Sequence, residues 1–129
     1  MKRILIDTNV YASFKRNETV AVDELRRAEY IGINIVVLGE ILSGFKGGKR
    51  EKQNIEELNL FLDSPRVHLI QIDEETAGFY AEIYWDLRRK GKPVPSNDMW
   101  VAASAMKHGL ALFTFDEHFN NINVLLLKT

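Results

Sequence analysis

The chain has 129 residues, enough for one domain, and 46% are hydrophobic, which excludes a globally disordered protein. It has no cysteine, which excludes disulfides and thiolate metal sites. The formal net charge of −1 argues against a strongly basic nucleic-acid-binding protein, although a site built of carboxylates would itself lower that sum. No apolar run approaches the ~20 residues of a membrane span or forms a signal peptide, so we expect a cytoplasmic protein without membrane contact.

Short apolar runs alternate along the chain with segments whose apolar residues recur at helical spacing. In the first half of the chain we expect a strand over 3–6, a helix opened by Asp7, Thr8 or Asn9, a helix from 18 to 31 ended by Gly32, a strand over 33–38 and a short helix from Glu40. In the second half we expect a helix over 51–62, a strand over 66–72, a helix over 74–91 and a helix capped by Ser96 or Asn97. A strand over 110–115 and a fifth candidate strand over 124–127 complete the chain.

This alternation predicts the fold class. Strands that alternate with helices favour a parallel sheet with helices on both faces. We therefore expect an α/β protein of the Rossmann type, with three layers (α/β/α) and a central, mostly parallel sheet of four or five strands. No domain linker, internal repeat or low-complexity segment interrupts the chain, which predicts a single domain over 1–129.

Four acidic residues lie where a strand should end or a helix should begin. Asp7, Glu40 and Asp116 follow apolar runs, and Asp98 opens a helix. Each alone is explained as well by helix capping or a polar loop. At the carboxyl edge of one parallel sheet, however, all four would meet, and crowded carboxylates repel unless protons or cations neutralise them. The pattern therefore favours a Mg²⁺ or Mn²⁺ site, because both ions take oxygen ligands.

The other polar candidates carry weaker signals. Lys46, Lys49 and Arg50 surround a Gly-Gly pair and could contact the phosphates of a nucleic acid, although most such clusters are solvated surface. Trp85 and Trp100 are expected to fill a subunit interface rather than the core, with base stacking as the alternative. The histidines show no metal-ligand spacing, and His118 is expected to be a surface or packing residue, with an approach to the acidic site as the alternative.

The chain resembles a PIN domain, and within that family a VapC-type toxin ribonuclease. The resemblance rests on ILIDTNVYASF, VLGEILSGF, PVPSNDMWVAASAMKHG and LFTFDEHFNNI, and so covers nearly the whole chain. It implies a PIN-like fold and a metal-dependent endoribonuclease that cleaves RNA by hydrolysis with Mg²⁺ or Mn²⁺. Catalysis and metal binding then fall on Asp7, Glu40, Asp98 and Asp116.

The resemblance also suggests supporting residues and partners. Thr8, Asn9, Asn97 and Thr114 would orient ligands and waters, and capping or turn bonding is the competing interpretation of each. An antitoxin that covers the active site and a homodimer are the partners that it implies. Three alternatives stay open: a PIN nuclease of RNA maturation or decay without an antitoxin, a catalytically inactive metal-binding module, and a metal-free ribonuclease that uses His68, His108 or His118.

Overall fold

The computed structural model describes residues 2–129, in which strands and helices alternate as the sequence predicts. In chain order the elements are β1 (Lys2–Ile6), α1 (Thr8–Lys15), α2 (Thr19–Arg27), β2 (Ala28–Asn34), α3 (Ile35–Lys46), α4 (Glu51–Leu62), β3 (Val67–Ile70), α5 (Glu74–Lys90), α6 (Ser96–His108), β4 (Ala111–Phe113) and the 3₁₀ helix η1 (Glu117–Asn121).

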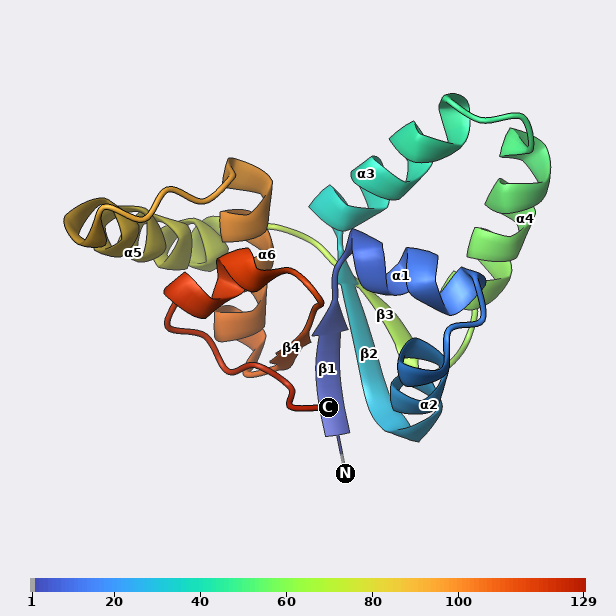
Figure 1. Ribbon diagram of the computed structural model, residues 1–129, viewed down its shortest axis with the longest axis horizontal. Helices are drawn as coiled ribbons and strands as arrows, with labels where there is room; N and C mark the ends of the chain where they lie inside the picture. The colour runs from blue at the N-terminus through green and yellow to red at the C-terminus, as the bar shows by residue number, and fades with distance from the viewer. Residues whose placement is uncertain (1) are drawn as a thin grey trace.

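Within residues 2–129, four strands form one parallel sheet in the order β3-β2-β1-β4. Ile4 of β1 is in register with Ile31 of β2 and with Ala111 of β4. Figure 1 shows α5 and α6 on the side of β4, and α1 to α4 on the side of β2 and β3. The predicted α/β class, with a parallel central sheet flanked by helices, is confirmed.

The core is centred on β1 and on the two strands beside it. Ile4, Leu5 and Ile6 have no exposed surface, which is typical of a parallel strand covered on both faces. Gly32 of β2 lies where a Cβ would approach the Cδ1 atom of Ile70 to 2.7 Å, so its lack of a side chain lets neighbouring side chains fill this space. No helix within residues 2–129 is long and apolar enough to cross a bilayer.

The second strand and the helix after it differ from the prediction. We expected a helix to run to Gly32 and a strand over 33–38, but β2 spans 28–34 and α3 begins at Ile35. The branched run favoured a strand by propensity. Asn34 overrides that preference, because its buried side chain accepts a hydrogen bond from the Val37 amide (2.9 Å) and caps a helix there.

The remaining boundaries differ less. Gly91 and Gly109 end α5 and α6 with φ of 66° and 63°, as expected for left-handed C-terminal glycines. The caps predicted at Ser96 and Asn97 are wrong: Pro95 occupies the cap position of α6 without a side-chain bond. Over 124–127 the structure has an isolated bridge between Leu112 and Leu126, because this segment is too irregular to pair as a fifth strand.

Candidate metal centre

The four acids come together in one pocket of about 260 Å³ beside the carboxyl ends of β1 and β4. Asp7 follows β1, Asp116 lies just beyond β4, and Asp98 is in the first turn of α6. Their convergence follows from the parallel sheet, which brings the ends of β1 and β4 to the same edge. The other residues that line the pocket are Thr8, Asn9, Pro95, Asn97, Val101 and His118.

Glu40 reaches this pocket from within a helix. The sequence predicted that it would follow a strand, but it lies in the second turn of α3, because the strand ends six residues earlier at Asn34. Its carboxylate accepts a hydrogen bond from the Thr8 hydroxyl (2.9 Å) and one from the Asn97 side-chain amide (2.7 Å). Residues from α1 and α6 therefore orient the Glu40 carboxylate at the pocket.

Asp7 is the most enclosed of the four acids, with 7% of its surface exposed. One oxygen caps α1 by accepting the Val10 amide at 3.0 Å, and the other accepts the Thr114 hydroxyl. Thr114 Oγ1 in turn accepts the Asp116 amide at 3.0 Å. The single hydroxyl of Thr114 thus connects Asp7, at the end of β1, with the backbone that carries Asp116.

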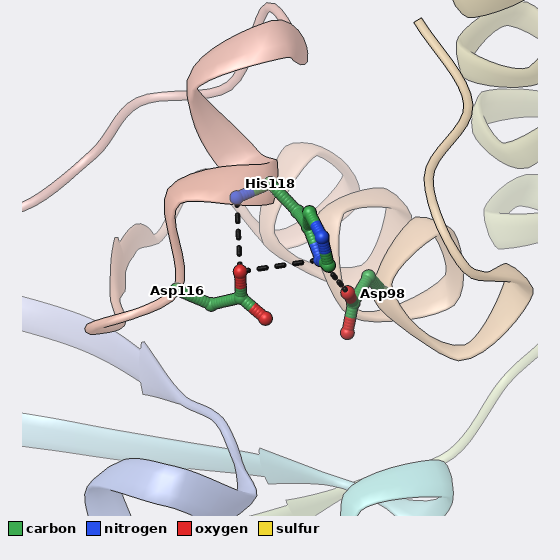
Figure 2. A group of neighbouring side chains, drawn as sticks. All are labelled: Asp98, Asp116 and His118. Atoms are coloured by element: carbon green, nitrogen blue, oxygen red, sulfur yellow. Dashed lines mark hydrogen bonds and ion pairs between the residues drawn. The ribbon is translucent and has the colours of Figure 1, made fainter.

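Asp98 and Asp116 lie on either side of the His118 imidazole (Figure 2). His118 Nδ1 is 3.3 Å from Asp98 Oδ2 and 3.2 Å from Asp116 Oδ1. The His118 backbone amide also donates to Asp116 Oδ1 at 2.9 Å, which closes the first turn of η1. Ligand atoms of these three residues lie within 4.8 Å of one another, so they could hold one ion. His118 is exposed, as expected, and it also lies at the acidic site, which was the alternative; the Asp-x-His spacing was the available signal.

The pocket disfavours its own negative charge. Burial raises the pKa of Asp7, against the lowering effect of its bonds to Thr114 and Val10, and the charge of Asp116 raises it further. Burial also raises the pKa of Asp98; the bond to His118 opposes this rise, while the charges of Asp116 and Glu40 add to it. A bound cation would remove this unfavourable interaction.

The donor set fits a divalent cation. Among the described residues that line the pocket, there is no lysine or arginine to neutralise the four carboxylates, and His118 is the one basic side chain. Mg²⁺ and Mn²⁺ take carboxylate oxygens and keep several waters, which a polar pocket of this size can accommodate. The observed arrangement therefore suits such an ion, with Asp7, Glu40, Asp98 and Asp116 as its potential ligands.

Other predicted residues lie apart from the acids or make no visible contact with them. Asn9 lines the pocket, but within residues 2–129 its side chain has no hydrogen bond to an acid. Lys46 pairs with Glu51 at 3.6 Å, and Arg50 bonds to Gln53, so both lie at the α3–α4 connection. A role in RNA contact for this connection, including Lys49, stays a prediction.

The tryptophans and the remaining histidines also lie outside the pocket. Trp100 stacks on Tyr80 at 4.1 Å between α5 and α6, whereas Trp85 is 55% exposed with Arg88 over its ring. His68 stacks on Tyr30 at the other end of the sheet. His108 is the last residue of α6, at the end of the helix opposite to Asp98. The histidines therefore do not gather into one acid–base site, which weakens the metal-free alternative.

The parallel sheet and the carboxylates gathered at its carboxyl edge define an α/β protein whose acidic side chains can bind a divalent cation. The chain belongs to the PIN domain family, whose sequence profile matches residues 4–125. It is 31% identical to Ribonuclease VapC4 of Mycobacterium tuberculosis over 120 residues, 92% of this chain and 90% of that protein. It is 29% identical to Ribonuclease VapC2 of Rickettsia felis over 129 residues, covering 96% of this chain and 95% of that protein.

Solved structures support the same fold. VapBC2 of Rickettsia felis, bound to a DNA fragment from its promoter, aligns with a TM-score of 0.84 at 25% identity, over 97% of this chain and 96% of that one. DNA-bound VapBC of Salmonella typhimurium aligns with a TM-score of 0.86 at 22% identity, over 99% and 98% of the two chains. The second likeness is one of fold alone. The resemblance to PIN domains that the sequence motifs suggested is thus confirmed.

Proposed function

We propose that this chain, as a single PIN domain over 1–129, is an endoribonuclease that depends on Mg²⁺ or Mn²⁺ and serves as the toxin of a VapBC-type pair. The observation that carries the proposal is the convergence of four carboxylates in a pocket without lysine or arginine among the described residues. Relatives named as VapC ribonucleases support RNA as the substrate. A bare anionic pocket would repel RNA phosphates, so the cation is required for binding as well as for chemistry.

Each acid has a defined part in this proposal. Asp7 and Asp98 are the principal carboxylate ligands, and Asp116 and Glu40 complete the site directly or through waters. When bound, the ion would supply Lewis-acid activation of water and charge stabilisation at the phosphorus. Hydrolysis of this kind leaves a 5′-phosphate and a 3′-hydroxyl.

Neighbouring polar groups hold the acids in position. Thr8 and Asn97 donate to both oxygens of Glu40, which keeps its carboxylate directed at the pocket. Thr114 donates to Asp7 and accepts from the Asp116 amide, so it ties two acids together. These bonds reduce the reorganisation that ion binding would demand.

A cognate antitoxin is the protein partner that we propose, since a free ribonuclease would harm its host. The similar VapBC2 structure of Rickettsia felis supports this pairing. A homodimer also stays a prediction; the exposed Trp85 on α5 is a candidate for its interface.

The decisive experiment is RNA cleavage by the purified chain with Mn²⁺, with Mg²⁺ and with EDTA, followed by analysis of the new ends. We expect cleavage with either ion, none with EDTA, and 5′-phosphate ends. The Asp98→Asn variant should lose at least about 100-fold in rate. Asp63→Asn, which changes an exposed acid at the end of α4, is the matched control and should keep full activity.

Two results would overturn the proposal. Cleavage that survives EDTA and leaves cyclic phosphates would indicate histidine acid–base chemistry. No turnover of any RNA, with the folded wild-type chain in excess and Mn²⁺ present, would leave a cation-binding module without nuclease activity.

A further inference from the structure

Among the described residues that line the acidic pocket, His118 is the one whose side chain offers a nitrogen ligand to a metal ion. Its imidazole lies between two carboxylates that come from different elements, Asp98 of α6 and Asp116 before η1 (Figure 2). Its side chain is 52% exposed, so neither burial nor packing in the core explains this position. What places it there is the local structure of the turn.

The turn holds His118 in place from both sides. The His118 amide donates to Asp116 Oδ1, and the Asp116 amide donates to Thr114 Oγ1. The next residue, Phe119, has no exposed surface and anchors η1 in the core. The backbone of His118 is therefore fixed relative to Asp116, and its ring can reach the pocket with little loss of conformational freedom.

The distances from Nδ1 suit ligands of a shared ion. Nδ1 lies 3.3 Å from Asp98 Oδ2 and 3.2 Å from Asp116 Oδ1, nearly equal and both long for a hydrogen bond, whose N···O distance is typically about 2.9 Å. Two ligands at right angles around an ion, each about 2.1 Å from it, are about 3 Å apart. The nitrogen is thus at a ligand-like distance from an oxygen of each carboxylate, and the three ligand atoms all lie within 4.8 Å of one another.

We infer that His118 supplies a nitrogen ligand, Nδ1, to the ion held by Asp98 and Asp116, and thereby makes the site prefer Mn²⁺ to Mg²⁺. The inference rests on the proposed metal dependence. Mg²⁺ takes oxygen ligands and gives up its waters reluctantly. Mn²⁺ has the lowest affinity of the first-row divalent metals in the Irving–Williams order, but as a transition-metal ion it accepts an imidazole nitrogen more readily than Mg²⁺ does. One imidazole in a carboxylate site therefore changes which ion fills it.

Mn²⁺ is the probe for the test because it is paramagnetic. Electron spin echo envelope modulation of Mn²⁺ bound to the full chain detects a nitrogen bonded directly to the ion, and needs no turnover. We expect a ¹⁴N coupling in the wild type and in His68→Ala, which removes a histidine far from the pocket. The coupling should be absent in His118→Ala. The affinity for Mn²⁺ should fall about tenfold in His118→Ala, with Mg²⁺ affinity nearly unchanged.

The outcomes separate this inference from the proposed function. Bound Mn²⁺ without nitrogen coupling in the wild type would overturn the inference and leave the carboxylate site intact. A coupling that persists in His118→Ala would overturn it as well, because another nitrogen would be the ligand. Failure of the folded wild type to bind Mn²⁺ at all would overturn both. Thermal unfolding of each variant in EDTA checks that the fold survives, which the exposure of His118 leads us to expect.

Discussion

The amide of Asn34 joins the two helices that carry Glu40 and Asp98, and its removal should destabilise the protein. Asn34 has no exposed surface. Its Oδ1 accepts the Val37 amide at 2.9 Å, and its Nδ2 lies 3.2 Å from Ser104 Oγ and 3.4 Å from the Trp100 carbonyl. One side chain therefore caps α3 and fastens it to α6.

The cost of Asn34→Ala follows from these bonds. Loss of a helix cap costs about 1 kcal/mol, and loss of a buried side-chain hydrogen bond costs about 1 kcal/mol more. Buried groups left without a partner add to this, so we expect a loss of about 2–4 kcal/mol in the free energy of unfolding. With a urea dependence of about 2 kcal/mol per molar, a loss of 3 kcal/mol lowers the urea midpoint by about 1.5 M.

Ser104→Ala is the matched variant, because it removes the partner on α6 and leaves the cap intact. It should cost about 1 kcal/mol. The double variant should cost less than the sum of the two single changes, by about 0.5–1.5 kcal/mol, since the shared bond can be lost only once. Urea unfolding in EDTA measures all four proteins without any contribution from bound ions.

A loss below about 1 kcal/mol for Asn34→Ala would refute this reasoning, because it would be smaller than the cap alone accounts for. Strict additivity of Asn34→Ala and Ser104→Ala would also refute it, by showing that the two side chains do not interact. The rate of RNA cleavage adds a second measurement. Asn34→Ala should slow cleavage more than Ser104→Ala does, because it also removes the cap of α3, and Glu40 on that helix then loses its alignment with Asn97.

Other substitutions test the charge and the packing around the pocket. Burial raises the folded-state pKa of Asp7 above its ordinary 3.8, so the folded protein binds this proton more tightly than the unfolded chain does. The resulting contribution to the free energy of unfolding is fully present below pH 3.8 and is lost as the pH rises through the folded-state pKa. Asp7→Asn should therefore raise the unfolding free energy at pH 7 in EDTA, and the gain should vanish below about pH 4; a loss at pH 7 would contradict this. The buried Tyr11 hydroxyl has no hydrogen-bond partner among the described residues, and burial together with the charge of Glu57 raises the pKa of Tyr11 to about 12. Tyr11→Phe should thus stabilise the fold by up to about 1 kcal/mol in urea unfolding, and destabilisation would reveal a partner for the hydroxyl. Gly32→Ala should cost about 1–2 kcal/mol, because the added Cβ would meet Ile70 Cδ1 at 2.7 Å; an unchanged urea midpoint would show that this side chain moves aside freely.

The positions of three acids could be predicted from local pattern, and the position of the fourth could not. Asp7, Asp98 and Asp116 lie at the element ends that the sequence indicated. Glu40 was expected at the end of a strand over 33–38, since branched residues favour strands. The Asn34 cap, supported by bonds to α6 across 70 residues of sequence, makes that run a helix instead.

The boundaries of the short elements were also beyond local reasoning. The strand β4 is limited to Ala111–Phe113, and the apolar segment 124–127 makes a single bridge, because pairing depends on how closely each segment approaches its neighbour in the sheet. A sequence pattern indicates which residues prefer burial, but it does not indicate which edge strand of the sheet is free to pair with a further segment.

The sequence by itself determined the alternation of strands and helices, the family and the identity of the four acids, because hydrophobic period, glycine stops and short motifs are local properties of the chain. Only the tertiary structure decided that Glu40 is held between Thr8 and Asn97, and that His118 lies between Asp98 and Asp116. Except for the pair His118–Asp116, which shares one turn, these contacts join residues from separate helices and turns. Their distances depend on how the helices pack on the sheet, and no local pattern in the chain encodes that packing.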